Sequence, residues 1–183
     1  MPEPTGLALA GVAGYLLGSI PSARLIAARR GVDPLAAGEG NPGAANVWRL
    51  LGPRYGAAVL SMDIGKGALA GLAGLALAGW WGACTAVVLA MVGHAWPAWS
   101  GFRGGRSVAC LTGGGLVLAP LPFLFAVLLF AAAARPAGLW RAAAAGLLAY
   151  PVLFAILVPD RWRLIGLGFA YLVLALAWLR KRA

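Results

Sequence analysis

Long apolar runs, separated by short polar stretches, set the pattern of this chain. Most runs are close to the ~20 residues that an α-helix needs to cross the hydrocarbon core of a bilayer. We therefore predict an all-α bundle that crosses a membrane several times and forms one domain over residues 1–183. The runs are, in order, 6–28, 55–79, 80–98, 107–134, 139–158 and 162–179.

The fourth run is too long for one straight span. As a single helix it would measure about 42 Å, against a hydrocarbon core of about 30 Å. Pro120 and Pro122 also interrupt it near the middle. The run is therefore either one long kinked helix or two short ones, over 107–119 and 121–134.

The distribution of charge distinguishes these alternatives and predicts which side of the membrane each loop lies on, because cytoplasmic loops are enriched in Lys and Arg. With two helices in the fourth run and the N-terminus outside, the Lys and Arg of the loops fall inside except for Arg161 and Arg163. No cation precedes the first run, and Arg29 and Arg30 follow it, which is typical of a retained helix rather than a signal peptide. We expect seven transmembrane helices, with the N-terminus outside and the C-terminus cytoplasmic.

Composition limits the partners of the protein. With 62% hydrophobic and 11% charged residues, the chain has too much apolar surface for a soluble domain. The net charge of +10 does not indicate nucleic acid, because the cations fall at the ends of apolar runs and not on one solvated face. Cys84 and Cys110 lack the spacing of a metal site. We expect the lipid bilayer as a partner, and no nucleic acid, metal or cofactor.

Two glycine-rich segments interrupt the apolar pattern on the predicted cytoplasmic side. GEGNPGAANVWR covers residues 38–49, and GHAWPAWSGFRGGRSVA covers residues 93–109. Glycines let backbone N–H groups converge on an anion, a helix N-terminus adds its dipole, and an arginine adds a bidentate grip. For either loop alone, a turn with an interfacial arginine is the alternative. Asn41 and Asn46 favour a site for two phosphates, because asparagines beside a membrane are costly unless they bond something.

Three further polar features interrupt the apolar helices. Asp63 and Lys66 share one face of the second helix, and we favour an internal pair that links helices and adds positive field near the site. His94 ends the third helix at the mouth of the second glycine loop, where a core histidine and a site residue are both compatible. Ser22 closes GSIPS, which interrupts the first helix and can face backbone or a ligand.

Taken together, four segments resemble the motifs of the bacterial acyl-phosphate-dependent glycerol-3-phosphate acyltransferases. They are GSIPSARL, GEGNPGAANVWRLLG, SMDIGKG and GHAWPAWSGFRGGRSVA, and the likeness runs from about residue 14 to 115. The resemblance implies a seven-helix enzyme of the bacterial inner membrane with its active site at the cytoplasmic face. It implies transfer of an acyl chain from acyl phosphate to glycerol 3-phosphate, which yields lysophosphatidate and phosphate. These two substrates would be its partners; the oligomeric state stays open, and a monomer is compatible.

The resemblance also suggests the site residues. It places Arg49 in the phosphate-binding loop and His94 in the third motif. We add as a hypothesis that Arg49 and Arg106 grip the two phosphates and that Glu39 joins His94 in the catalytic set. We expect the proton of the attacking hydroxyl to pass to His94, to Glu39 or to the substrate's own phosphate. The phosphate-binding set is Ser22, Gly38, Gly40, Asn41, Gly43, Asn46, Gly104, Gly105 and Ser107.

The chain also departs from the family pattern. Glu39 stands where the pattern GSGNPGATNVxR has a serine, and Arg106 and Ser107 replace the lysine and the last glycine of GGKG. The family's late RYVSLAS-like and HRxNIxRL segments do not occur. These departures leave an alternative, a diverged non-catalytic membrane protein that binds a phosphorylated lipid. An anion transporter is disfavoured, because the polar loops lie at one surface and not at mid-membrane.

Overall fold

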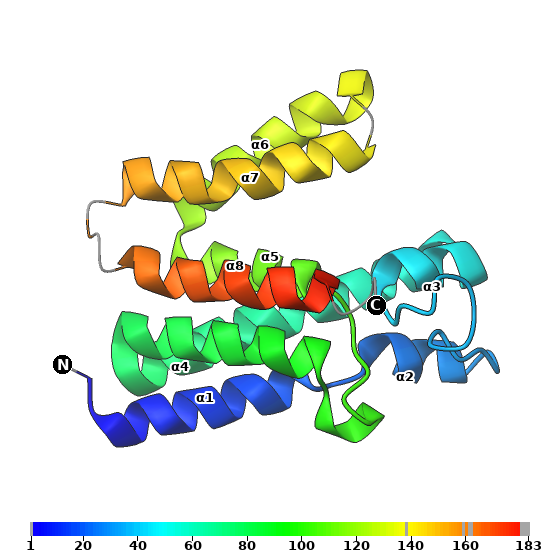
Figure 1. Cartoon of the computed structure of the whole chain (residues 1–183), viewed down its shortest axis with the longest axis horizontal. Helices are drawn as coiled ribbons and strands as arrows, with labels where there is room; N and C mark the ends of the chain where they lie inside the picture. The colour runs from blue at the N-terminus through cyan, green and yellow to red at the C-terminus, as the bar shows by residue number, and fades with distance from the viewer. Residues whose placement is uncertain (1, 138, 159, 161–162, 180–183) are drawn as a thin grey trace.

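The computed structural model describes residues 2–137, 139–158, 160 and 163–179, and over these residues the chain is all-helical (Figure 1). The side chains of residues 131 and 133–144 lie outside the description, as do four cations used in the charge argument, Arg161, Arg180, Lys181 and Arg182. The helices are α1 (Pro4–Gly18), α2 (Ser22–Ala28), α3 (Ala44–Leu51), α4 (Pro53–Ala95), η1 (Ala98–Ser100), α5 (Val108–Leu118), α6 (Pro120–Ala137), α7 (Leu139–Leu157) and α8 (Arg163–Leu179).

The first apolar run is divided into α1 and α2 by a short break. Ser19 and Ile20 follow the end of α1, and Pro21 precedes α2. Proline lacks a backbone N–H and restricts the residue before it, so the helix cannot continue through this point. The interruption that GSIPS predicts is therefore present, and it leaves backbone groups available to other partners.

Helix α4 is a hairpin of two limbs. The chain leaves helical geometry at Ala78 and at Gly79, whose φ is +61°. The limbs then pack closely, since a Cβ placed on Gly74 would lie 2.2 Å from the carbonyl oxygen of Gly82. Residues 55–79 and 80–98, expected as two helices, thus correspond to two limbs joined by a tight turn.

Small residues also bring α1 against the second limb of α4. A Cβ on Gly14 would lie 2.2 Å from the carbonyl oxygen of Ala86, and one on Gly18 would lie 2.0 Å from that of Ala90. Such contacts between backbones are how helices associate in lipid, where apolar burial alone gives little driving force. This packing fixes the start of α2 beside the end of α4.

The long fourth run forms two helices, α5 and α6. They part at Ala119, which has φ −154° and ψ 82° and directly precedes Pro120. Figure 1 shows α6 and α7 as an antiparallel pair that stands off the rest of the bundle, with α8 running beneath it. Tyr150 of α7 ties this pair to α5 by donating a hydrogen bond to the Gly115 carbonyl at 3.3 Å.

The outer surface is largely apolar. Large side chains such as Leu72, Ile156 and Phe169 are exposed, which suits a lipid environment. Two segments, Pro4–Ala28 and Pro53–Ser100, are long and apolar enough to cross a membrane, and the remaining apolar helices are shorter. The polar segments instead gather at one end, where α2, α3 and the loop between them meet the segment after α4 (Figure 1).

Candidate functional site

Two cavities of different character meet at Asp63 and His94. The larger is a mostly apolar groove of about 500 Å³, lined by residues of α3 to α8. The smaller is a polar pocket of about 20 Å³ between α2 and the segment after α4. Asp63 and His94 line both, so these two side chains form a shared wall between an apolar and a polar compartment.

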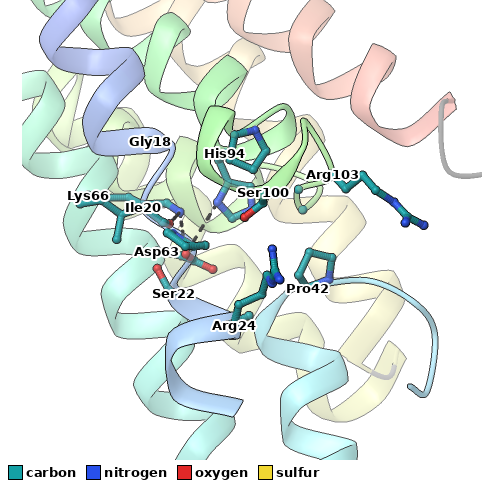
Figure 2. Close-up of a pocket in the computed structure, with 15 residues that line it drawn as sticks. Gly18, Ile20, Ser22, Arg24, Pro42, Asp63, Lys66, His94, Ser100 and Arg103 are labelled. Atoms are coloured by element: carbon teal, nitrogen blue, oxygen red, sulfur yellow. Dashed lines mark hydrogen bonds and ion pairs between the residues drawn. The ribbon is translucent and has the colours of Figure 1, made fainter. Parts of the chain in front are cut away.

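A buried charge cluster forms that wall (Figure 2). Lys66 Nζ lies 2.9 Å from Asp63 Oδ1, and His94 Nδ1 lies 3.6 Å from the same oxygen. Lys66 also donates a hydrogen bond at 3.0 Å to the carbonyl of Ile20, which the break between α1 and α2 leaves available. Burial of charge is costly unless each group is paired, and here the single acid faces two basic side chains. The predicted Asp63–Lys66 pair is present, and it joins α4 to the α1–α2 break.

The polar pocket carries hydroxyl groups and arginines. Ser22 Oγ and Ser100 Oγ are buried, and neither has a hydrogen-bond partner among the described residues. Arg24, on α2, lies beside Pro42, and Arg103 also lines the pocket, further from Asp63 than Arg24 (Figure 2). Ser22 was predicted from the sequence, whereas Arg24, Ser100 and Arg103 were missed. Arg24 and Arg103 stand inside the quoted motifs, GSIPSARL and SGFRGG, so their position beside predicted site residues was the available signal.

The second glycine loop folds tightly over the end of α4. The N–H of Gly104 donates to the Ala95 carbonyl at 3.1 Å, and the N–H of Gly105 donates to the His94 carbonyl at 2.9 Å. A Cβ on Gly105 would lie 2.2 Å from His94 Nε2, so only glycine fits against this edge of the ring. These amides therefore satisfy carbonyls at a helix end, which would otherwise lack partners. This differs from the phosphate contacts expected of them.

Ser107 likewise bonds the protein itself. It has φ +61° and its hydroxyl donates to the Met91 carbonyl at 2.8 Å. The hydroxyl expected to meet phosphate is thus engaged with α4, although Ser107 does line the groove.

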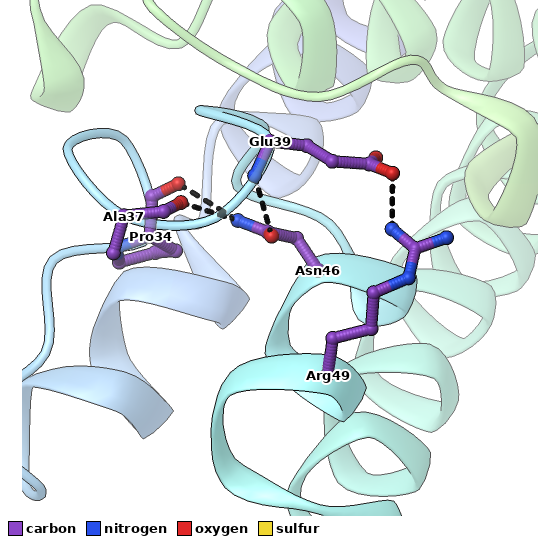
Figure 3. A network of polar contacts seen from close by, with 5 residues as sticks. All are labelled: Pro34, Ala37, Glu39, Asn46 and Arg49. Atoms are coloured by element: carbon purple, nitrogen blue, oxygen red, sulfur yellow. Dashed lines mark hydrogen bonds and ion pairs between the residues drawn. The ribbon is translucent and has the colours of Figure 1, made fainter.

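The first glycine loop is held by a buried asparagine (Figure 3). Asn46 Oδ1 accepts a hydrogen bond from the N–H of Glu39 at 2.9 Å, and its Nδ2 donates to the carbonyls of Pro34 at 3.1 Å and Ala37 at 3.0 Å. Gly38 has φ +63°, and a Cβ there would lie 2.2 Å from Asn46 Oδ1. Asn46 and Gly38 therefore shape the loop.

Other members of the first loop face the groove. Asn41 and Gly43 line it, and Asn41 is buried. Gly40 has φ +62°, and its N–H donates to the Ala37 carbonyl at 3.2 Å, which continues the turn. The loop thus presents Asn41 to the groove and keeps the bonds of Gly40 within itself.

Arg106 and Arg49, the two arginines expected to bind phosphate, differ in their surroundings. Arg106 lines the groove, and its Cζ lies 4.5 Å from the centre of the Trp178 ring, a cation–π contact that orients the guanidinium. Its buried Nε has no hydrogen-bond partner within the described part of the chain. Arg49, in contrast, forms an ion pair with Glu39. Arg49 lies one helical turn after Ala45, which lines the groove, so the pair stands beside the groove.

The far part of the groove is suited to an alkyl chain. Phe123, Val127 and Phe130 line it from α6, and Leu147 and Tyr150 line it from α7. Phe123 and Tyr150 meet edge to face, with ring centres 6.3 Å apart. One cavity therefore offers a polar end at His94 and Arg106 and an apolar end between α6 and α7.

Comparison with known proteins adds a family to this geometry. Residues 8–183 match the family described as "Glycerol-3-phosphate acyltransferase". A protein of that name from Symbiobacterium thermophilum is 48% identical over 111 residues, covering 61% of this chain and 55% of the relative. One from Agrobacterium fabrum is 39% identical over 160 residues, covering 86% and 78%. The alignments with several curated relatives thus span about half of their length.

Two solved structures share the fold. Both are of PlsY, an integral membrane glycerol 3-phosphate acyltransferase. Its glycerol 3-phosphate form is 29% identical with a TM-score of 0.82, and its lysophosphatidic acid form is 28% identical with a TM-score of 0.78. Each likeness covers 96% of this chain and 88% of the other. This chain is an all-helical membrane protein, and it belongs to the glycerol-3-phosphate acyltransferase family.

Proposed function

We propose that the protein transfers an acyl chain from acyl phosphate to glycerol 3-phosphate and forms lysophosphatidate and phosphate. The observation that carries this proposal is the meeting of an apolar groove and a polar pocket at His94 and Asp63. An acyl donor and a hydroxylated acceptor need compartments of these two kinds. The names of the relatives and the two ligand forms of PlsY support the same reaction.

In this proposal the acyl chain lies in the groove between α6 and α7. Its phosphate points toward Arg106, whose Nε has no other partner among the described residues, and toward Asn41. The floor of the polar pocket has room for roughly one water-sized group. A hydroxyl of the acceptor enters there beside His94, and its phosphate stays near the mouth, within reach of Arg24 and Arg103.

The chemistry needs alignment and charge neutralisation more than a covalent intermediate. Acyl phosphate is already activated, so the acceptor oxygen forms a bond to the carbonyl carbon while the bond from that carbon to the phosphate oxygen breaks. The released phosphate keeps the electron pair, and arginines stabilise its charge. We assign the proton acceptor to His94, which borders both compartments, and the substrate phosphate is the other candidate. Glu39 lines neither compartment and is paired with Arg49 instead.

We further propose that the site faces the cytoplasm of a bacterial inner membrane. Arg29, Arg30, Arg54 and Arg103 are exposed and belong to the end of the bundle that holds α2 and α3, in keeping with the positive-inside rule. Arg163, at the start of α8, belongs to the opposite end (Figure 1). The N-terminus would then lie outside.

One assay tests the reaction. Purified protein is given acyl phosphate and labelled glycerol 3-phosphate, and lysophosphatidate is measured. We expect product, and Arg24→Gln should raise the KM for glycerol 3-phosphate about tenfold, the effect of one lost hydrogen bond to a charged group. Arg29→Gln, at the C-cap of the same helix but outside the pocket, is the matched control. Binding of glycerol 3-phosphate without product would favour the non-catalytic, lipid-binding alternative.

A further inference from the structure

The ion pair between Glu39 and Arg49 is the feature on which a further role rests (Figure 3). The two side chains are 42% and 47% exposed, so the pair meets water and is not locked in the core. Arg49 is one of the two arginines expected to grip phosphate, yet a carboxylate of the same chain already holds it. A carboxylate and a phosphate oxygen compete for the same guanidinium donors.

The backbone delivers Glu39 to this position. Its N–H donates to Oδ1 of Asn46, which is fully buried and also holds the carbonyls of Pro34 and Ala37. The main chain at Glu39 is therefore anchored to α3, the same helix that carries Arg49. Because only the side chain beyond the anchored backbone is free to turn, the carboxylate stays within reach of Arg49 even when it is displaced.

The neighbouring charges show what changes when a phosphate displaces Glu39 from Arg49. Asp63, the other acid near the groove, is paired with Lys66 and cannot serve Arg49 at the same time. Arg106 is stacked on Trp178 and has no acidic partner within the described residues. Thus, of the two arginines expected to grip phosphate, only Arg49 carries an internal anion.

We propose that Glu39 is an internal competitor for Arg49, which a substrate phosphate must displace before the guanidinium can bind it. This rests on the proposed function and adds to it that Arg49, which the resemblance places in the phosphate-binding loop, also binds one of the two substrate phosphates. Exposed ion pairs are weak, so Glu39 lowers the affinity for phosphate without closing the site. Glu39 thereby determines how strongly the enzyme binds its phosphorylated substrates.

The test compares Glu39→Gln and Glu39→Ser with the parent enzyme. Both variants keep the backbone N–H that bonds Asn46, so the loop anchor remains. We expect the KM of the substrate held by Arg49 to fall about two- to fivefold with kcat retained, in line with the weak coupling of exposed pairs. KM is measured for acyl phosphate and for glycerol 3-phosphate, which identifies the phosphate concerned. Glu3→Gln, the same chemical change at the far end of α1, is the matched control.

Two further measurements make the outcome decisive. The effect of Glu39→Gln should vanish in an Arg49→Gln background, because no guanidinium is left to compete for. It should also shrink in high salt, which screens exposed charges. A fall in kcat on Glu39→Gln would mean that Glu39 acts as the base, and a rise in both KM values would mean that it orients Arg49. Either result overturns the competitor role.

Direct binding separates this proposal from the proposed reaction. Inorganic phosphate and glycerol 3-phosphate, each added alone, should raise the melting temperature of Glu39→Gln at lower concentration than that of the parent. This readout needs no turnover. If the parent makes no lysophosphatidate but the shift is seen, the reaction is wrong and the competitor role stands; an unchanged concentration dependence rejects the competitor role.

Discussion

Gly105 shows how a single backbone position controls a side chain in the site. Its missing Cβ leaves the space that His94 Nε2 occupies. We predict that Gly105→Ala displaces the His94 ring and lowers acyl transfer at least tenfold, since a misplacement of about 1 Å at a reacting centre is costly. Activity and melting temperature are measured together.

The matched control is Gly65→Ala. This glycine lies within α4, and a Cβ there meets nothing within 4 Å. Alanine should therefore be neutral or stabilising in the helix. Equal loss of activity in both variants would show that the space beside His94 is unimportant.

We predict that Asn46 stabilises the folded protein, whether or not it also contacts substrate. Asn46→Asp replaces the Nδ2 donor by an oxygen and leaves the carbonyls of Pro34 and Ala37 facing an acceptor. We expect a loss of about 2–4 kcal/mol in the free energy of unfolding, because a buried bonded group becomes unsatisfied. Thermal or denaturant unfolding without substrate measures this. Unchanged stability with weakened phosphate binding would instead support a direct contact with the ligand.

At the scale of helices, α6 and α7 define how far the groove extends. Val127 on α6 lines the groove, and Val127→Trp should fill part of it. We expect the KM for long-chain acyl phosphates to rise about tenfold while short chains are little affected. Val152→Trp on α7, which is exposed and does not line the groove, is the control. A uniform loss across chain lengths would mean that the acyl chain lies elsewhere.

Helices were the part of the structure that local sequence could predict. The apolar runs and the proline at position 120 indicate where helices run and where the fourth run divides. The turn at Gly79 within α4 also falls at the predicted boundary between two spans. Periodicity and helix breakers are local signals, so they can be recognised without knowing which helices pack together.

The contacts within the candidate site were harder to predict from the sequence. From the sequence we expect the backbone N–H groups of Gly104 and Gly105 to bind an anion. In the structure they donate hydrogen bonds to carbonyls at the end of α4. The partner of Lys66 at Ile20 lies 46 positions away and depends on how α1 packs on α4. Likewise, Arg24 joins the pocket only because α2 lies beside the segment after α4. Tertiary packing decides these contacts, and no short motif encodes it.

At the scale of the whole molecule, the proposed orientation can be measured. Thr5, at the start of α1, and Arg54, at the start of α4, are both exposed and lie at opposite ends of the bundle (Figure 1). We predict that Thr5→Cys reacts with a membrane-impermeant thiol reagent in intact cells and that Arg54→Cys reacts only after the cells are opened. Cys84 and Cys110 are buried and should give little background. The reverse pattern would invert the proposed topology.

The shared wall of Asp63 and His94 also has a kinetic consequence for the proposed reaction. In the proposed reaction the acyl donor lies in the groove and the acceptor in the pocket, on either side of this wall, so both can be bound at once. Neither has to leave before the other enters. Initial rates should therefore give intersecting double-reciprocal lines, whereas parallel lines would point to an acyl-enzyme. On this proposal a lipid-soluble and a water-soluble reactant are brought together across the side chain of His94.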